Sequence, residues 1–227
     1  DNARRTISDR FVKRGTIYDR NDIPVSYTDG TSGDYERVYP VPELSPIIGY
    51  TQPFFGQAGL ESSLDEILRG LENQSPWRIW INHLLYGQSP QGLDVLITID
   101  SELQKYAAEL LPNTPGAVVL LDSNTGELLV LYSSPFYDAN TLGDNWDMLN
   151  EDPESPLLNR ATQSLYPPGP ALAPYIAAFS GVSGNLPSEI TELSSPLESS
   201  KLTCTKAIPL PATWGEAIRA GCPGPLE

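Results

Sequence analysis

Residues 159–178 read NRATQSLYPPGPALAPYIAA, an approach loop followed by a turn and the start of a helix. Tyr166 precedes a proline, so its backbone is pushed to extended geometry, and Gly169 marks the turn. Pro170 suits the first helical position, where its missing N–H is not needed. From Ala171 onward the side chains are small and apolar, which is typical of a helix that is apolar all round. The stretch predicts a buried helix that begins at Pro170.

The pattern N-R-A-T-Q-x-x-Y-x-P-G before an apolar helix resembles the segment that carries the nucleophile in class B penicillin-binding proteins, the peptidoglycan D,D-transpeptidases. In that family Pro-Gly is followed by Ser-x-x-Lys, in which the serine attacks a carbonyl and the lysine one turn later activates it. Matched position by position, the serine falls on Pro170 and the lysine on Ala173. Proline offers no nucleophile and alanine no titratable group. The resemblance therefore implies degenerate positions at Pro170 and Ala173 and no catalytic residue.

Other parts of the chain resemble the same family. They are RGTIYDRN at 14–21, GQAGLE at 56–61, DVLITIDSELQ at 94–104 and the β-rich run 116–135 with its Asn-Thr-Gly turn. The resemblance implies an α+β fold, with an N-terminal pedestal or dimerisation-like region at 1–92. Residues 93–227 are expected to form a partial transpeptidase-like domain, in which an antiparallel hairpin packs on helices, including the helix after Pro170. Because the family continues into further strands of its sheet, the resemblance implies a C-terminally truncated member.

Charge and hydropathy limit the classes of partner. The chain carries a formal net charge of -15, and such a balance excludes nucleic acid and anionic membrane surfaces, which need clustered Lys and Arg. No apolar run is long enough to span a membrane. The resemblance implies a place on the extracytoplasmic face of the bacterial cell membrane, through an N-terminal anchor helix absent from this chain. It also implies partners among peptidoglycan or cell-wall synthesis and division proteins.

Cys204 and Cys222 are the two cysteines, and His83 is the single histidine, so no His/Cys metal site is expected. The cysteines could close a loop or remain as two buried thiols. Since the resemblance places the chain outside the cytoplasm, it implies a Cys204–Cys222 disulfide, which would contribute about 3 kcal/mol by restricting the unfolded chain.

Local patterns predict the elements around residue 100. Residues 94–100 are expected to form an apolar strand, and Ser101 is expected to cap a helix over 102–111. The apolar face of that helix is predicted to hold Leu103, Ala107, Leu110 and Leu111. Residues 62–71 are predicted to be an amphipathic helix, and residues 47–51 a short extended piece.

No other motif replaces the missing chemistry. Ser183-Gly184-Asn185 imitates the family's Ser-x-Asn motif but follows the helix too closely, and Thr203-x-x-Lys206 imitates Ser-x-x-Lys without a glycine turn or an apolar helix. Neither a Ser/His/Asp order nor a glycine-rich phosphate loop is present, so no cofactor is expected. The favoured interpretation is a non-catalytic penicillin-binding-protein-like scaffold of peptidoglycan synthesis or division. The alternatives are an active transpeptidase with an unrecognised nucleophile, and a peptidoglycan-binding module that uses the tryptophans.

Overall fold

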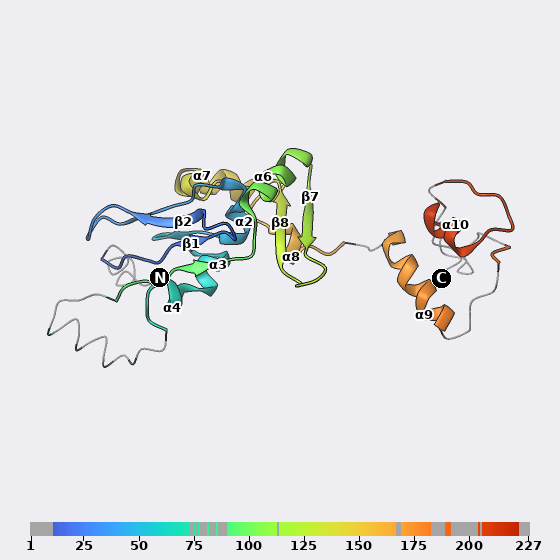
Figure 1. Cartoon of the computed structure of the whole chain (residues 1–227). Helices are drawn as coiled ribbons and strands as arrows, with labels where there is room; N and C mark the ends of the chain where they lie inside the picture. Colours follow the sequence, from blue (N-terminus) through green and yellow to red (C-terminus); the bar gives the residue numbers. More distant parts are fainter. Residues whose placement is uncertain are drawn as a thin grey trace. The chain divides into compact units, whose positions relative to one another are not determined.

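The structure is a computed structural model that describes residues 11–72, 90–112, 114–166, 169–182, 189–191 and 206–222, with the single residues 75, 77, 81, 85 and 204. The chain forms two compact units, Asp1–Ser164 and Leu165–Glu227 (Figure 1). Each unit is described by itself. The architecture is α+β, as predicted.

A mixed sheet forms one side of the first unit. Its strand order is β3-β2-β1-β6, antiparallel except for the parallel pair β1 and β6. The strands are β1 (Ile17–Tyr18), β2 (Pro24–Asp29), β3 (Glu36–Val38) and β6 (Val95–Leu96). A tight turn joins β1 and β2, and the Asp19 carboxylate stabilises it by accepting the backbone N–H groups of Asn21 and Ile23 at 2.8 and 2.9 Å.

Short helices follow the sheet. They are η1 (Pro42–Leu44), α2 (Ser45–Ile48), α3 (Gly59–Ser63) and α4 (Asp65–Leu68), with the two-residue strands β4 (Thr51–Gln52) and β5 (Gly56–Gln57) between α2 and α3. The prediction of an extended piece at 47–51 is wrong at its start, because Pro46 lies in the first turn of α2 and Gly49 ends this helix at φ 77°. The predicted helix over 62–71 is interrupted at Leu64, whose backbone leaves the helical region.

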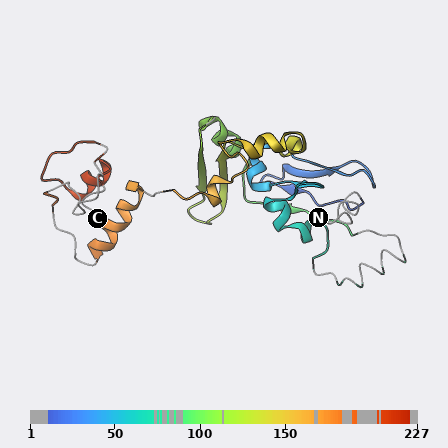
Figure 2. The same ribbon diagram turned by 180° about the vertical axis from the view of Figure 1, so that it is seen from behind.

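The hairpin predicted from residue 116 onward is confirmed. Strands β7 (Gly116–Leu121) and β8 (Leu128–Ser134) pair antiparallel, and α6 (Ser101–Leu110) packs beside β8 (Figures 1 and 2). The N-cap of α6 is Asp100 and not Ser101: the Asp100 carboxylate accepts the backbone N–H groups of Glu102 and Leu103. Ser101 is instead buried and donates its hydroxyl to Asp19 at 2.6 Å. This bond ties α6 to the β1–β2 turn.

The buried face of α6 also differs from the prediction. Of the four predicted residues, Ala107 is buried and Leu111 is partly buried in a small cluster, whereas Leu103 and Leu110 are exposed and Gln104 is buried in their stead. Gln104 is buried because its carboxamide pairs with the backbone of β8: it accepts the N–H of Leu131 at 3.1 Å and donates to the Leu131 carbonyl at 3.2 Å. A polar side chain with backbone partners has thus taken the central position that an apolar pattern assigns to leucine.

One hydrophobic core joins the sheet, the hairpin and the helices behind them. Buried Ile17, Leu44 and Leu142 share this core with Leu131 of β8. Two further helices complete the unit, α7 (Leu142–Glu151), which follows the turn η2 (Ala139–Thr141), and α8 (Arg160–Gln163). This core contains residues from both sides of position 92 in the sequence. The two compact units therefore do not separate there but after Ser164. The division into functional domains at 92/93 stays a prediction.

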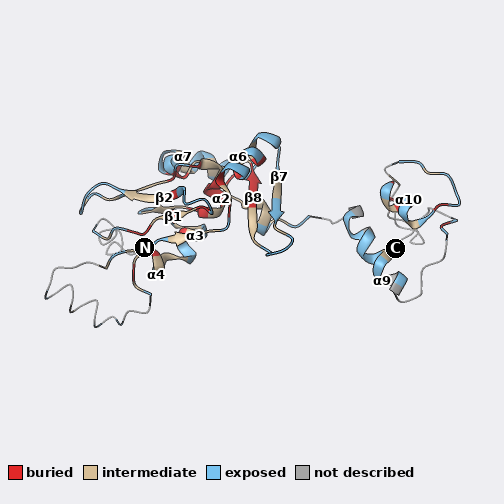
Figure 3. Ribbon diagram, viewed as in Figure 1, coloured by how far each residue is buried: buried red, intermediate tan, exposed pale blue. Residues whose placement is uncertain are grey.

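The second unit contains η3 (Gly169–Leu172), α9 (Ala173–Val182) and α10 (Trp214–Arg219). Its small core gathers Ile190, Ala217 and Cys222 around the cysteine pair. The prediction of a buried α9 is not met within its own unit, where Tyr175 and Phe179 are 73% and 76% exposed (Figure 3). The helix is apolar all round, but the described elements of its own unit cover too little of it. Packing of the hairpin on this helix concerns both units and stays a prediction.

A buried ion network holds the sheet of the first unit to α3 and α4. The Glu61 carboxylate, which is fully buried, accepts Arg14 Nη2 at 3.0 Å, Arg37 Nε at 2.7 Å and the Ser26 hydroxyl at 2.7 Å. Arg14 also binds Asp65 at 2.6 Å. Burial alone would lower the pKa of Arg14, but Glu61 and Asp65 outweigh this effect and raise it. Strand residues and helix residues are therefore fixed by one shared carboxylate.

Replacement of Glu61 by glutamine should destabilise the first unit strongly. The variant leaves the buried Arg37 guanidinium without its charge partner and Arg14 with Asp65 alone, and breaking a buried pair in this way costs about 3–5 kcal/mol. Urea denaturation followed by tryptophan fluorescence measures the change. The exposed Glu66→Gln in α4 is the matched control and should change stability by less than about 0.5 kcal/mol. Equal stability of the two variants would contradict the role of the network.

Replacement of Asp19 by asparagine should cost about 1–3 kcal/mol at pH 7, the value typical of a broken buried hydrogen-bond group. Burial alone would raise the pKa of Asp19, but hydrogen bonds from Ser101, Ile23 and Asn21 hold it below the ordinary 3.8. A lowered pKa contributes stability above the unfolded value, and this contribution is lost as the pH falls through the folded value. The difference from the parent should therefore shrink below about pH 4. A pH-independent difference would contradict this assignment, and Asp34→Asn, which removes an exposed carboxylate, is the control.

Candidate functional site

Helix α8 leads the chain into the predicted nucleophile segment. Asn159 caps this helix by accepting the Ala161 N–H at 3.1 Å, and its amide donates to the Pro46 carbonyl of α2 at 3.0 Å. The Ser133 hydroxyl of β8 accepts the Arg160 N–H at 3.0 Å and donates to the Leu158 carbonyl at 3.1 Å. The N-R-A-T-Q motif is thus fixed to both the pedestal helix α2 and the hairpin.

The Arg160 side chain holds the acidic loop before the motif. Its guanidinium donates to the Ser155 carbonyl at 3.1 Å and to the Glu154 carbonyl. Ser155 has a positive φ of 45°, an uncommon conformation for a residue other than glycine. Arg160 therefore positions the backbone of this loop. The first two residues of the motif, Asn159 and Arg160, both have structural roles.

The two positions predicted to be degenerate lie where the helix begins. Pro170 is in the 3₁₀ turn η3 and Ala173 is the first residue of α9. A serine three residues before a lysine at this point would present both groups on one side of a helix start. Proline and alanine bring neither a nucleophile nor a base, and proline also lacks the backbone N–H that could help to bind an oxyanion.

The structure describes only a small part of the two sequence motifs that imitate catalytic ones. Residues 183–185, with their Ser-Gly-Asn, and Thr203 lie outside the described residues. Lys206 is exposed, and its backbone N–H donates to the Ala220 carbonyl at 3.1 Å. Within the described ranges, no group of three His, Cys, Asp or Glu side chains could hold a metal ion. A search of the same ranges finds no helix that could cross a membrane.

A cleft of about 470 Å³ lies in the first unit beside α8. Its walls come from α2, the start of α3, β8 and α8, and sequence reasoning did not find it because these elements are far apart in the chain. Apolar groups of Ile47, Leu60, Leu131 and Leu157 line it together with the rings of Tyr50 and Tyr137. Its polar lining consists of hydroxyl and amide groups of Ser62, Ser63, Asn159, Thr162 and Gln163. None of the described lining residues is an acid, a lysine, an arginine or a histidine.

The tyrosines of the cleft are not acid–base groups at neutral pH. Burial raises the pKa of Tyr137 well above its usual range, and its hydroxyl donates to the Ser45 carbonyl at 3.0 Å. Burial also raises the pKa of Tyr50. Both side chains therefore stay neutral, and the cleft has the chemistry of a binding site rather than of a proton-transfer site.

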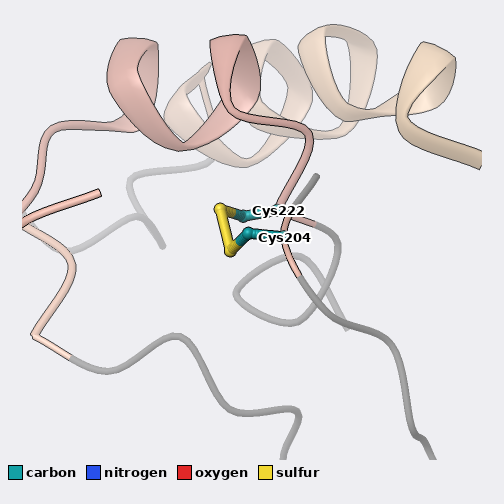
Figure 4. Close-up of a disulfide and its surroundings, with 2 residues drawn as sticks. All are labelled: Cys204 and Cys222. Carbon is teal, nitrogen blue, oxygen red and sulfur yellow. A yellow bond between two sulfur atoms is a disulfide. The ribbon is translucent and has the colours of Figure 1, made fainter. Parts of the chain in front are cut away.

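The predicted disulfide is present in the second unit. Cys204 and Cys222 are bonded, and the pair lies beneath α10 (Figure 4). Thr213 and Glu216 form a capping box at the start of α10, which fixes the helix that packs on the bond. The two cysteines are distant from Pro170 in sequence, and they are part of the small core of the second unit.

Comparison with known proteins identifies two domains. The model of the penicillin binding protein A dimerisation domain matches residues 14–95, and that of the penicillin binding protein transpeptidase domain matches residues 116–196. The peptidoglycan D,D-transpeptidase PbpA of Mycolicibacterium smegmatis is 33% identical over 184 residues, 74% of this chain and 37% of the relative. PbpA of Mycobacterium tuberculosis is 30% identical over 236 residues, 97% of this chain and 45% of the relative. This chain spans less than half the length of these relatives.

Solved structures show the same fold. Penicillin-binding protein A from M. tuberculosis, as an imipenem acyl-enzyme complex, superposes with a TM-score of 0.80 at 28% identity, over 95% of this chain and 55% of that chain. A D,D-transpeptidase domain from Eggerthella lenta superposes with a TM-score of 0.73 at 27% identity, over 91% of this chain and 47% of that chain.

Reduction of the disulfide should destabilise the second unit alone. The bond closes a loop between residues 18 positions apart, and such a loop contributes about 3 kcal/mol. Hydrogen exchange of the α10 amides should accelerate after dithiothreitol treatment, while that of α6 stays unchanged. The double variant Cys204→Ser with Cys222→Ser should already exchange fast and should not respond to the reductant. Slow exchange of α10 in the reduced protein would show that the bond is dispensable.

Proposed function

The chain belongs to the class B penicillin-binding proteins, and from this membership we propose that it is a non-catalytic member with a supporting role in peptidoglycan synthesis or cell division. The observation that carries the proposal is the pair Pro170 and Ala173 at the start of α9. The family places its nucleophile and its base there, and neither residue can take either role. Acyl transfer needs both groups, and their loss from a working enzyme costs several powers of ten in rate.

A scaffolding role is supported by what remains. The first unit keeps a buried ion network, a continuous core and a motif helix fixed on two sides, none of which depends on the missing pair. We therefore assign the interaction role to this unit, with proteins of cell-wall synthesis or division as partners. In line with the family resemblance, we place the chain on the extracytoplasmic face of the bacterial cell membrane.

A β-lactam experiment tests the proposal. The full chain, incubated with imipenem or penicillin G, should show no covalent adduct in intact-protein mass spectrometry. Penicillin-binding protein A from M. tuberculosis, whose acyl-enzyme complexes with both compounds are known, is the positive control. The relative should gain one drug-derived mass per chain under the same conditions.

A stoichiometric adduct on this chain would overturn the proposal. Peptide mapping of such an adduct would name the nucleophile and would favour the alternative, an active transpeptidase that uses another residue. An adduct that survives in the variant Lys206→Ala would further exclude the Thr203-x-x-Lys206 pattern as the source of the base.

A further inference from the structure

Helix α7 turns an acidic face to solvent. Its apolar residues pack inward, where Leu142 is fully buried in the core and Leu149 packs against it. Four exposed residues follow the spacing i, i+3, i+4 and i+7, which places them together on one side of the helix (Figure 3). They are Asp144, Asp147, Met148 and Glu151, and together they form the acidic face of α7.

The carboxylates of this face have no partner among the described residues. None of the ion pairs or hydrogen bonds between those residues involves Asp144, Asp147 or Glu151. Neighbouring acids differ, because Asp138 and Asp152 each accept a backbone N–H at 2.8 Å and so stabilise turns. The charge of the acidic face therefore has no such role within the described part of the first unit.

The same arrangement disfavours the helix itself. Like charges three or four positions apart repel on a helix surface, and Asp147 has both Asp144 and Glu151 at these spacings. Glu151 is also the last residue of α7, where the partial negative charge of the helix end disfavours a carboxylate. Residues 106–159 contain no lysine, arginine or histidine that could offset these effects from within the same stretch. A face that lowers the stability of its own helix indicates positive charge supplied by another molecule.

Apolar side chains lie on and beside the acidic face. Met148, the single methionine of the chain, is 64% exposed within it. The β4–β5 turn adjoins α7, since the Phe55 ring stacks on Trp146 with centroids 4.3 Å apart. Phe54, at the tip of this turn, is 86% exposed. Methionine and aromatic side chains are enriched at protein interfaces, and methionine adapts its shape to that of a partner.

We propose that the acidic face of α7 is a docking surface for a basic amphipathic helix of a protein partner. Lysines or arginines three and four positions apart on that helix would pair with the carboxylates, and an apolar residue among them would contact Met148. A second copy of this chain is a poor occupant, because both copies carry a net charge of -15 and repel each other. The proposal deepens the interaction role proposed for the first unit and rests on that role, but not on the absence of catalysis.

A basic helical peptide of about 14 residues, long enough to cover the ten residues of α7, tests the surface. It carries lysines at the spacing of the three carboxylates and a leucine at the spacing of Met148, with alanine and glutamine elsewhere. Calorimetric titration of the full chain should show saturable binding that weakens as salt is added, because salt screens exposed charges. Two-dimensional amide NMR should place the shifted signals on α7.

Matched variants separate this surface from the general acidity of the chain. Asp147→Asn with Glu151→Gln should weaken binding at least tenfold. Asp34→Asn with Glu109→Gln removes the same two charges from exposed positions elsewhere and should bind like the parent. Met148→Ala should weaken binding severalfold. A peptide with serine in place of the leucine should bind more weakly by a similar factor and should not respond to Met148→Ala.

Several results would overturn the proposal. They are no saturable binding, NMR shifts confined to residues outside α7, equal weakening by the two double variants, and equal binding of a peptide with glutamate in place of lysine. A dimer of the chain in sedimentation equilibrium that Met148→Ala abolishes would identify a second copy as the occupant instead. The β-lactam experiment is read separately: an adduct together with peptide binding refutes the non-catalytic role alone, and failure of peptide binding without an adduct refutes the docking surface alone.

Discussion

The first unit depends on one buried carboxylate. Glu61 has no exposed surface and accepts hydrogen bonds from Arg14, which precedes β1, from Ser26 of β2 and from Arg37 of β3. Such a charge is stable in the interior because the two guanidinium groups and the hydroxyl satisfy it together. The arrangement also constrains the chain in space. It brings α3 against the strands, and α3 in turn forms one wall of the cleft opposite α8. The position of this wall of the cleft is therefore a consequence of the ion network.

Local sequence signals predicted those elements whose reasons are local. The β7–β8 hairpin and the helix after residue 100 follow from turn residues and apolar periodicity, and both are present. The cysteine pairing followed from the family resemblance rather than from spacing. The cap of α6 could have been found locally, since Asp100 is as good an N-cap as Ser101. The choice between them depends on Asp19, which lies 82 residues before Ser101 in the sequence and accepts a hydrogen bond from the Ser101 hydroxyl.

What sequence could not predict depends on distant partners. Periodicity put leucines on the inner face of α6, but Gln104 occupies it because β8 offers two backbone groups at Leu131. Periodicity also cannot tell a buried apolar helix from one that is left uncovered within its own unit, as α9 is. The cleft needs residues from α2, α3, β8 and α8 at once. No single stretch carries a signal for it, although the positions of Asn159 and Thr162 within the family motif marked one of its walls.

Proline at 170 and alanine at 173 are favourable residues for the helix start that carries them. Proline is pre-organised for the first turn of a helix, and alanine has the highest helix propensity, whereas a serine and a buried lysine at a helix start bring polar groups that must be satisfied. Catalytic groups at such a position lower the stability of the helix that carries them. A helix with Pro170 and Ala173 at these positions does not have that loss of stability. The supports of the motif lie elsewhere, in the bonds of Asn159 and Arg160 to α2 and β8. The proposed absence of the chemistry is therefore compatible with the architecture of the first unit, because these contacts do not involve Pro170 or Ala173.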